Sequence, residues 1–436
     1  MNNFFTYLDT KKYTLKSAQE LEQELHDTLS LDTPLDNKSD FIEAVTGVFN
    51  ATRPTRGKNF HNLLFGGADT SAVLADMLTP VMNVTMHTYK SGGVHILLEN
   101  EIIQKMIQKI GWTNGDGVIT SGGSISNLYG MLLARNNADP LFQEQGKTKE
   151  LSCYASELSH YSVVKNASVS GIGKQSIHFI PTDDAGRMDS IALEESIKKD
   201  IKEGKKPSLL HITSGTTVRG SFDNIKVLSN IARAYGMWVH VDITWGSGVF
   251  FNSQLQRLID GIDAVDSVAW NPHKFMGIPL TASVFLTQKR HALKDAFRVD
   301  SEYLFQTESI TYNPGLKTLQ CGRRNDAFKI WAAWKQGGDK KFEEKMDTLL
   351  ALRNYMLGII KNNKEIILFE EPQYLNVCFR LEYENAKESC LRLESEYGIR
   401  VSHAHIDGQD YIRFIFVNNT ITKKDIDFFI SSLLKK

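Results

Sequence analysis

The residues with the clearest capacity for chemistry lie around Lys274, which follows Asn271, Pro272 and His273. Residues 266–270 before them are largely apolar and predict a buried strand. A lysine at the end of a core strand loses hydration, which favours its neutral amine. Such an amine attacks aldehydes, so the pattern predicts a lysine that forms a Schiff base. The alternative, which Lys274 alone favours, is a lysine with a buried stem and a solvated ammonium.

A glycine-rich turn and an aspartate mark the ends of two further predicted strands. Gly122 and Gly123 follow residues 117–120 and open a helix, whose free N–H groups favour a phosphate. A turn of this kind is as often only a turn. Asp242 ends an apolar strand, where its charge is costly unless a cation meets it. It suits a protonated heterocyclic nitrogen, and equally a helix cap or an ion pair.

His160 and Thr213 also follow predicted strands, at residues 151–155 and 208–213. Each alone is more typical of a structural residue, a capping or core histidine and a turn threonine. All these residues together nevertheless match one chemistry. A phosphate cradle, a carboxylate for a pyridinium, a ring to stack and a buried lysine make up a pyridoxal phosphate (PLP) site.

Each part of such a site has its own task. Lys274 would bind the cofactor aldehyde, and Asp242 would keep the ring nitrogen protonated so that the ring accepts electrons. His160 would stack on the ring. The phosphate would be held by Gly123, Ser124 and His273.

The composition excludes several other classes of protein. A formal net charge of -1 over 436 residues gives no support to nucleic-acid or membrane-surface binding. No apolar run is long enough for a transmembrane helix, and the N-terminus has no secretory-signal pattern. Four scattered cysteines fit buried thiols in a reducing cytoplasm better than disulfides or zinc: Cys153, Cys321, Cys378 and Cys390. We expect a cytoplasmic protein with no metal site.

Helix and strand patterns alternate between about residues 95 and 290. This alternation predicts an α/β fold with a mostly parallel sheet and helices on both faces. A helix at residues 325–335 leads to a region of mixed helices and strands. We expect three parts, a helical N-terminal arm at 1–60, a PLP-binding large domain at 61–325 and a small α+β domain at 326–436.

Several segments, in the same order along the chain, resemble the group II PLP-dependent amino-acid decarboxylases. Asp242 precedes Lys274 by 32 residues, and the lysine ends the sequence Asn-Pro-His-Lys. The other matching segments are residues 120–128, 159–162, 213–223, 303–306 and 319–323. Over about residues 60–436 the chain is most similar to the glutamate and cysteine sulfinate decarboxylase branch of that family.

The resemblance implies fold type I of the PLP enzymes, with a seven-stranded, mostly parallel sheet flanked by helices and a small C-terminal α+β domain. It also implies a homodimer with active sites at the subunit interface. The cofactor would be bound by Ser121, Gly122, Gly123, Ser124, His160, Thr213, Asp242, Thr244, Asn271, His273 and Lys274.

The same resemblance gives roles to two distant residues. Tyr303 matches the tyrosine of a mobile loop that reaches the other subunit and protonates Cα after carbon dioxide leaves. Arg413 matches an arginine of the C-terminal domain whose planar fork binds a substrate carboxylate. The alternatives are a core aromatic for Tyr303 and an ordinary strand arginine for Arg413.

The chain departs from its relatives at positions near the cofactor and the substrate. Thr244 replaces the usual alanine beneath the ring, where it would crowd the ring or donate a hydrogen bond to the cofactor. Leu63 replaces a glutamine amide, and Phe65, as in the sulfinate branch, would favour a substrate shorter than glutamate. Thr85 replaces asparagine or serine, and His87 replaces an aromatic residue and would restore an anion contact or prefer another group. The loop after Tyr303 is a few residues shorter.

These observations predict a PLP-dependent L-amino-acid decarboxylase that releases carbon dioxide and a primary amine. Aspartate or cysteine sulfinate is the leading substrate, followed by glutamate. The departures at Leu63, Thr85 and His87 leave a non-acidic amino acid open. Two other readings are an aldehyde-forming oxidative deaminase on the same fold and a non-catalytic interaction protein. Lys274, Tyr303, His160 and Asp242 are the predicted catalytic residues.

Overall fold

The computed structural model describes residues 16–32, 34–53, 55–299, 301, 303–305 and 310–435. Internal contacts divide them into two compact units. The large unit contains Ala68–Asn354 and Glu370–Cys378. The small unit contains the described residues up to Gly67, Tyr355–Phe369 and the described residues from Phe379 on. The three-part division at residues 60 and 325 stays a prediction.

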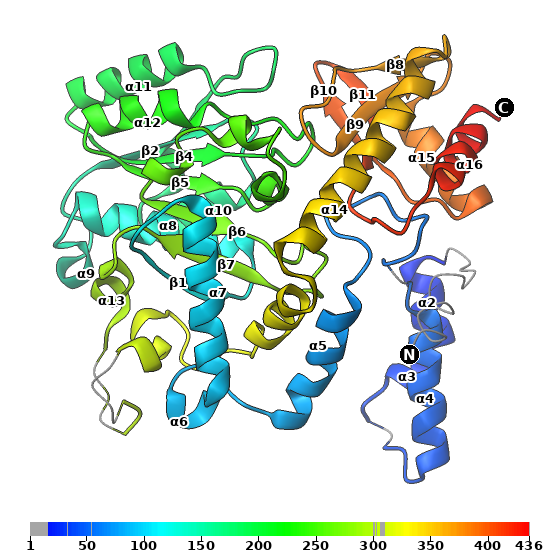
Figure 1. The fold of residues 1–436 in the computed structure, drawn as a ribbon, viewed down its shortest axis with the longest axis horizontal. Coiled ribbons are helices and arrows are strands. Elements are labelled where there is room, and N and C mark those ends of the chain that lie inside the picture. The colour runs from blue at the N-terminus through cyan, green and yellow to red at the C-terminus, as the bar shows by residue number, and fades with distance from the viewer. Residues whose placement is uncertain are drawn as a thin grey trace. The chain divides into compact units, whose positions relative to one another are not determined.

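A seven-stranded sheet forms the centre of the large unit (Figure 1). Its order is β1-β7-β6-β5-β4-β2-β3. The neighbours from β3 to β6 are parallel, and β7 is antiparallel to both β1 and β6. The predicted mostly parallel α/β sheet is therefore confirmed. The strands are β1 (Asp116–Thr120), β2 (Leu151–Ser156), β3 (Ile177–Ile180), β4 (Lys206–Thr213), β5 (Trp238–Asp242), β6 (Ser267–Trp270) and β7 (Ser283–Thr287).

Helices flank this sheet, and most of them connect consecutive strands (Figure 1). The α-helices are α5 (Thr70–Met82), α6 (Tyr89–Gly92), α7 (Val94–Ile110), α8 (Gly123–Ala138), α9 (Phe142–Gln145), α10 (Ser162–Val169), α11 (Ser190–Lys202), α12 (Ile225–Ala234) and α13 (Ala292–Phe297). Short 3₁₀ helices lie at Lys174–Ser176, Gly246–Phe251, Gln256–Ile259, Ile262–Ala264, Ile310–Tyr312 and Pro314–Lys317.

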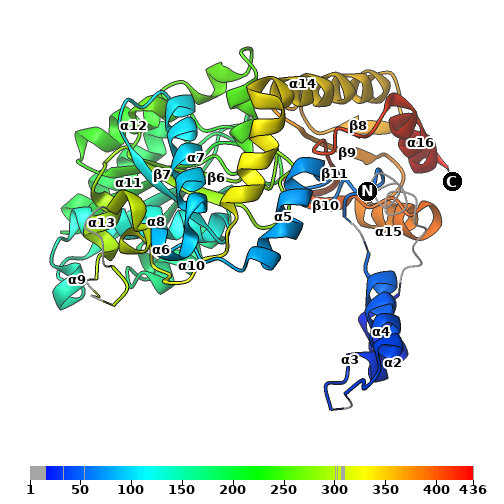
Figure 2. The same cartoon turned by 60° about the horizontal axis from the view of Figure 1, so that its bottom comes forward.

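The long helix α14 (Ala327–Lys361) changes direction within the large unit, as Figure 2 shows. The break lies at Gly338, whose φ of 61° is in the left-handed region that glycine adopts at little cost. Trp334 Nε1 donates to Asp339 Oδ1 across the break at 2.8 Å. The predicted helix at residues 325–335 corresponds to the first part of α14, which begins at Ala327 and is interrupted by the non-helical Gly338. The second helical part, which continues to Lys361, was not predicted.

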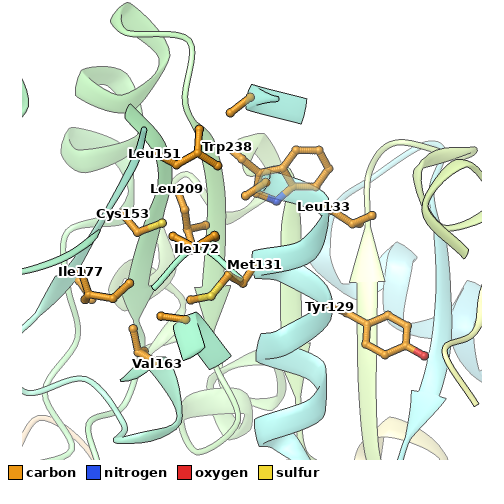
Figure 3. Close-up of a cluster of buried hydrophobic side chains, with 14 of the residues drawn as sticks. Tyr129, Met131, Leu133, Leu151, Cys153, Val163, Ile172, Ile177, Leu209 and Trp238 are labelled. Atoms are coloured by element: carbon orange, nitrogen blue, oxygen red, sulfur yellow. The ribbon is translucent and has the colours of Figure 1, made fainter. Parts of the chain in front are cut away.

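One buried core lies between α8 and the sheet (Figure 3). Met131 and Leu133 of α8 belong to the same cluster as Leu151, Cys153 and Leu209 of strands β2 and β4. Residues two apart on a strand face the same side of a sheet, so Leu151 and Cys153 both point into this core. Burial of each large aliphatic side chain stabilises the fold by about 1.5–3 kcal/mol. The packing fixes α8, and with it the glycine turn at its start.

The small unit has its own sheet, in the order β10-β11-β9-β8. Its strands are β8 (Ile366–Leu368), β9 (Asn376–Leu381), β10 (Ser402–Ile406) and β11 (Gln409–Ile415). Its helices are α2 (Ala18–Glu24), α3 (His26–Leu29), α4 (Lys38–Ala51), α15 (Ala386–Tyr397) and α16 (Lys423–Leu434). Phe414 of β11 packs edge-on against Phe429 of α16, with ring centroids 4.8 Å apart. The predicted small α+β domain is confirmed.

The cysteines and the helix hydropathy bear on two expectations from composition. Three cysteines are buried free thiols, as expected: Cys153, Cys378 and Cys390. The expectation is wrong for Cys321, which is exposed. In the described part of the chain, no helix combines the length and the hydropathy that crossing a membrane requires.

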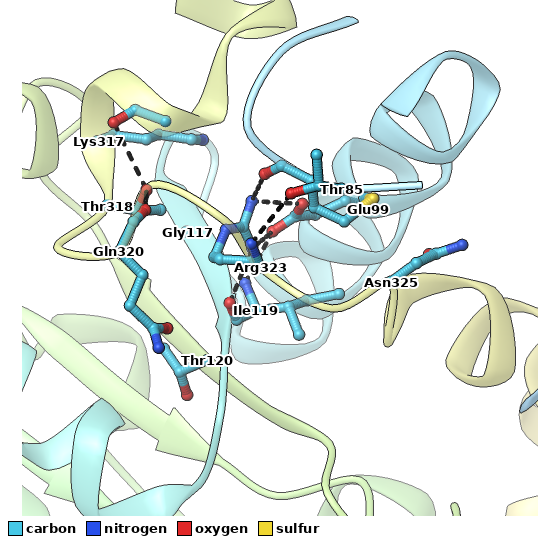
Figure 4. A network of polar contacts seen from close by, with 12 residues as sticks. Thr85, Glu99, Gly117, Ile119, Thr120, Lys317, Thr318, Gln320, Arg323 and Asn325 are labelled. Atoms are coloured by element: carbon cyan, nitrogen blue, oxygen red, sulfur yellow. Dashed lines mark hydrogen bonds and ion pairs between the residues drawn. The ribbon is translucent and has the colours of Figure 1, made fainter. Parts of the chain in front are cut away.

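A buried ion pair ties the elements of the large unit that precede the glycine turn (Figure 4). Arg323 donates from Nη1 and Nη2 to the two oxygens of Glu99 in α7, at 2.8 and 2.9 Å. The same guanidinium donates to the carbonyls of Ile119 in β1 and Met86, at 2.8 and 2.6 Å. Paired and hydrogen-bonded in this way, the buried charge holds three segments together.

Removal of the Glu99 carboxylate therefore has a large predicted cost. Glu99→Ala leaves the Arg323 guanidinium buried without its counter-charge, which should destabilise the large unit by about 3–5 kcal/mol. Glu101→Ala on the same helix removes an exposed carboxylate and serves as the control. Thermal unfolding followed by circular dichroism should give a clearly lower midpoint for Glu99→Ala alone. Equal midpoints would show that the ion pair does not anchor these segments.

Candidate active site

The predicted cofactor-binding residues lie at or just after the carboxyl ends of five strands of one sheet. Thr120 ends β1, Ser156 ends β2, Thr213 ends β4, Asp242 ends β5 and Trp270 ends β6. In open α/β sheets, ligands bind outside the carboxyl ends of the strands. The fold therefore brings to one edge residues that are up to 150 positions apart, as Thr120 and Trp270 are.

Lys274 lies in a tight turn after β6 and contacts Thr244, which follows β5. Its backbone N–H donates to the Asn271 carbonyl at 3.0 Å. Its Nζ donates to Thr244 Oγ1 at 2.9 Å. Burial lowers the pKa of Lys274 to about 8, although the charge of Asp242 opposes that shift. A larger share of the amine is therefore neutral near pH 7 than in an exposed lysine.

Asp242 is buried and yet held as a carboxylate. Its Oδ1 accepts from the Thr244 N–H at 3.0 Å, and its Oδ2 accepts from Asn127 Nδ2 at 2.7 Å. Burial alone raises the pKa of Asp242, but nearby His211 and Lys274 and these two hydrogen bonds outweigh it. The net result is a pKa below the ordinary aspartate value. The side chain offers a fixed negative charge at the end of β5.

The glycine turn before α8 can receive an anion. α8 begins without a side-chain cap, so its first N–H groups are open to a ligand. A Cβ on Gly123 would lie 2.7 Å from Asn271 Nδ2 and 3.2 Å from Thr244 Cγ2, so this position requires glycine. Ser121 and Ser124 beside it are exposed.

His273 and Asn271 form the adjoining wall. His273 Nδ1 lies 2.6 Å from the Ala282 carbonyl and donates to it, so Nε2 of the neutral ring is an acceptor that faces Asn271 Nδ2. Burial, followed by the charge of Lys274, lowers the pKa of His273 to about 4, so the ring is neutral at pH 7. Asn271 Nδ2 lies 3.4 Å from His273 Nε2, and Asn271 Oδ1 accepts from Ser283 Oγ at 2.5 Å.

His160 and Thr213 belong to the same group. His160 Nδ1 lies 2.8 Å from Ser162 Oγ. Burial lowers the pKa of His160, and the charges of Asp242 and Lys274 both act on it. Thr213 Oγ1 lies 3.1 Å from the hydroxyl of Ser159, the residue before His160.

These side chains fit PLP by their chemistry. The amine of Lys274 suits an aldehyde, and the carboxylate of Asp242 suits a protonated pyridine nitrogen. The uncapped turn at Gly123 suits a phosphate, because any side chain there would fill the space. The sequence had predicted each of these groups, but it had not predicted the hydrogen bond from Lys274 to Thr244.

Two predicted substrate residues, Thr85 and His87, lie together in the large unit. The Arg323 N–H donates to Thr85 Oγ1 at 3.3 Å, and the same hydroxyl lies 3.3 Å from His87 Nδ1. Burial, followed by the charge of Arg323, lowers the pKa of His87. His87 is therefore a neutral hydrogen-bonding group at pH 7 and carries no charge for an anion.

Leu63, Phe65 and Arg413 lie in the small unit. Arg413 donates from Nε to Ser402 Oγ at 3.0 Å and from Nη2 to the Asn62 carbonyl at 2.8 Å. The arginine therefore contacts the segment that carries Leu63 and Phe65. Leu63 is exposed, and the ring of Phe65 lies 6.0 Å from that of Phe60.

Tyr303 lies in a turn with 78% of its surface exposed. Within the same turn, the N–H groups of Leu304 and Phe305 both donate to the Ser301 carbonyl at 3.0 Å. The rest of the loop that sequence predicts to be short, residues 306–309, lies outside the described residues.

Sequence reasoning missed the residues behind Asp242. Asn127, which donates to Asp242, also lies 3.0 Å from His240 Nε2 and 3.4 Å from Ser162 Oγ. The signal in the sequence was the alternation of Trp238, His240 and Asp242 with valines, which places all three on one face of β5.

Comparison with known proteins gives a consistent family. Residues 32–382 match the pyridoxal-dependent decarboxylase conserved domain. The chain is 39% identical to the acidic amino acid decarboxylase GADL1 of Bos taurus over 331 residues, which is 74% of this chain and 64% of that protein. It is 31% identical to the cysteine sulfinic acid decarboxylase of Homo sapiens over 452 residues, covering 98% and 91% of the two chains.

A solved structure extends this likeness to three dimensions. The crystal structure of mouse CSAD superposes with a TM-score of 0.93 at 31% identity, covering 98% of this chain and 93% of that one. The alignments to the bovine and human GADL1 proteins span 64% and 66% of those proteins, slightly less than two thirds. With the family model matching most of its length, the chain belongs to the pyridoxal-dependent decarboxylase family.

Proposed function

We propose that the protein is a PLP-dependent carboxy-lyase that converts a short acidic L-amino acid into carbon dioxide and a primary amine. The observation that carries the proposal is the group at the carboxyl edge of the sheet, where Lys274, Thr244 and Asp242 are joined by hydrogen bonds. The position of Gly123 beside Thr244 completes this group.

Different residues would bind different parts of the cofactor. When bound, PLP supplies an aldehyde for amines and a protonated ring that accepts the electron pair of a broken Cα–carboxylate bond. Lys274 would provide the amine that holds the aldehyde, and Asp242 would accept the hydrogen bond of the ring nitrogen. His160 and Thr244 would contact the ring. The phosphate would be held by Ser121, Gly122, Gly123, Ser124, Thr213, Asn271 and His273.

Tyr303 is the proposed proton donor to Cα. Its exposed side chain is available to a second copy of the chain, in keeping with the resemblance that places this tyrosine in the other subunit's site. Proton delivery at Cα yields the amine, whereas failure of this step would leave Cα open to oxidation by dioxygen, which gives an aldehyde and ammonia. The presence of Tyr303 therefore supports complete decarboxylation over an oxidative deamination.

An acidic substrate is supported by the relatives and by one arginine. The printed names of two relatives specify acidic amino acids and cysteine sulfinic acid. Arg413 supplies a guanidinium for a carboxylate or sulfinate, and the bulk of Phe65 favours a short side chain. A neutral His87 and an apolar Leu63 add no positive charge, so a substrate with an uncharged polar side chain is the second candidate.

The functional protein is proposed to be a cytoplasmic homodimer. Helix α4 has no buried residue, and four large apolar side chains on it are exposed: Phe41, Ile42, Val45 and Val48. Helix α5 also exposes Leu74, Met77, Leu78 and Val81. Exposed apolar surface of this extent is typical of a subunit interface. A second copy of the chain is the occupant that the resemblance implies.

Incubation of the purified, PLP-loaded protein with a panel of amino acids tests the function. We expect carbon dioxide and the matching amine from aspartate or cysteine sulfinate, with glutamate slower, as measured by gas release and amine chromatography. Lys274→Ala should abolish both products. Aldehyde and ammonia in place of the amine would identify the oxidative reaction. If the wild-type protein showed no visible absorbance from a bound cofactor, the result would instead support a non-catalytic protein.

The hydrogen bond from Lys274 to Thr244 predicts a specific effect on cofactor uptake. Thr244→Val keeps the side-chain volume and removes the hydroxyl, so the amine is held less well. Uptake of PLP by the apoprotein, followed by visible absorbance, should slow about 2- to 10-fold. Thr244→Ser should behave like the wild type, and Thr244→Ala should retain cofactor and activity.

The pH dependence of the rate of PLP uptake by the apoprotein reports the protonation of the Lys274 amine. Because its pKa is lowered to about 8, uptake should rise with pH up to about 8 and then level off. An exposed lysine would continue to gain rate towards pH 10. A rate that still climbs at pH 10 would contradict the placement of Lys274 in a buried site.

The apolar face of α4 gives a test of the homodimer. Val45→Glu places a charge in the proposed interface and should shift the protein from dimer to monomer, as measured by light scattering after gel filtration. Glu43→Lys changes a charge on another side of the same helix and is the control. A wild type that is monomeric would refute the homodimer.

A further inference from the structure

Behind Asp242, four buried side chains with polar groups lie between the sheet and α8. Trp238 and His240 lie on β5, Ser267 on β6 and Asn127 on α8. His240 and Ser267 are direct partners in the β5–β6 register. Trp238 is visible beside α8 in Figure 3. These four residues are named here the donor relay.

The hydrogen bonds of the relay have a direction that begins at Trp238. An indole N–H only donates, and Trp238 Nε1 donates to Ser267 Oγ at 2.8 Å. Asn127 Oδ1, which only accepts, lies 3.0 Å from His240 Nε2, so the ring proton lies on Nε2. His240 Nδ1 is then unprotonated and accepts from the Ser267 hydroxyl at 2.8 Å.

That tautomer orients the next residue. His240 Nε2 donates to Asn127 Oδ1 at 3.0 Å, which turns the amide of Asn127 toward Asp242. Asn127 Nδ2 donates to Asp242 Oδ2 at 2.7 Å. Burial, followed by the neighbouring His211, lowers the pKa of His240 to about 3, so the ring stays neutral, as the relay requires.

Asn127 also begins a second branch. The other hydrogen of its Nδ2 points to Ser162 Oγ at 3.4 Å. The Ser162 hydroxyl is then free to donate to His160 Nδ1 at 2.8 Å, and the Ser162 N–H approaches the same atom at 3.2 Å. His160 accordingly carries its proton on Nε2. One amide thus orders both groups proposed to contact the cofactor ring.

The chain has a glycine where the relay needs space. A Cβ at Gly130 of α8 would lie 2.6 Å from His240 Nδ1 and 2.7 Å from its Cγ. The helix and the strand therefore approach closely enough for Asn127, one turn earlier, to reach His240. Such an approach would be unnecessary for an apolar core, which would fill the space with a side chain.

We propose that the donor relay Trp238–Ser267–His240–Asn127 positions Asp242 for the cofactor ring nitrogen and, through Ser162, sets the tautomer of His160. This inference rests on the proposed function and adds positioning residues to it. None of the four relay residues needs to touch the cofactor. Their effect reaches it through the orientation and ionisation of Asp242.

Other titratable groups also face Asp242. They are His211 on β4, Lys274 after β6 and His160 before α10, in addition to His240. His211 has a pKa lowered to about 4, mainly by burial, so it stays neutral above pH 5. Variants of Asn127 and Ser267 leave all of these groups in place. The difference between the titration of such a variant and that of the wild type, in which the same groups also titrate, therefore reports Asp242.

The test is a pH titration of cofactor retention by the full-length protein, read from visible absorbance. Asn127→Leu removes the donor to Asp242, whose pKa should rise toward the value that burial favours. Bound PLP should then be lost at a pH about one to two units higher than in the wild type, with about 10-fold weaker binding at pH 7. Ser267→Ala breaks the relay at its far end and should shift the titration in the same direction by a smaller amount.

Ser208→Ala is the matched control. Ser208 is a buried serine of the same sheet that bonds to the Ser152 carbonyl at 2.9 Å and lies outside the relay. The pH titration of cofactor retention for Ser208→Ala should coincide with that of the wild type. The variant Ser267→Thr keeps a hydroxyl at the relay position, so its titration should lie closer to that of the wild type than the titration of Ser267→Ala. Circular dichroism checks that the variants are folded.

The outcomes separate the relay from the function. If Asn127→Leu and Ser267→Ala bind PLP with the wild-type titration, the relay proposal is overturned and the proposed function stands. If Ser208→Ala shifts as much as Ser267→Ala, the effect is general destabilisation and the proposal is likewise overturned. A wild type without cofactor absorbance would refute the proposed function itself.

Discussion

The burial of one carboxylate, that of Asp242, is the constraint on which the rest of the site depends. An isolated charge in a protein interior is so costly that the group would otherwise take up a proton. The chain meets this cost with two hydrogen bonds, from Asn127 and from the Thr244 N–H, and with the nearby amine of Lys274. The amine in turn loses hydration and becomes a better nucleophile. The protonation states of Asp242 and Lys274 therefore depend on each other and on the burial of both groups.

This constraint explains several features that packing alone would not require. A strand in the middle of a parallel sheet is usually apolar on both faces. β5 instead alternates valines with Trp238, His240 and Asp242, and the polar side chains all face α8. Polar groups at that depth are stable only when each has a partner, which is why α8 supplies Asn127 and a glycine at position 130. The charged group at the edge of the sheet, Asp242, therefore requires polar side chains in the core behind it.

The sequence could predict the edge of the site but not its interior. Asp242 and Lys274 interrupt apolar runs at strand ends, and a glycine turn opens a helix, so local pattern alone places them. Asn127 and His240 are 113 residues apart, and no local pattern pairs them. Local pattern was sufficient at α14, where Gly338 interrupts the helix three residues after the predicted end at Lys335. Long-range partners therefore decide the pairs inside the core, whereas local pattern decides the ends of elements.

The proposed reaction residues and the proposed substrate residues belong to different units. The group that includes Lys274 and Asp242 lies wholly in the large unit, whereas Arg413 and the segment with Leu63 and Phe65 lie in the small unit. Arg413 donates to the Asn62 carbonyl, so its guanidinium is held by the segment that carries Leu63 and Phe65. Under the proposed function, a change at Leu63 or Phe65 would alter the fit of a substrate side chain without moving the charges of the Lys274 group. Divergence at these positions, with the Lys274 group intact, is the pattern expected of a family that keeps one reaction and varies its substrate.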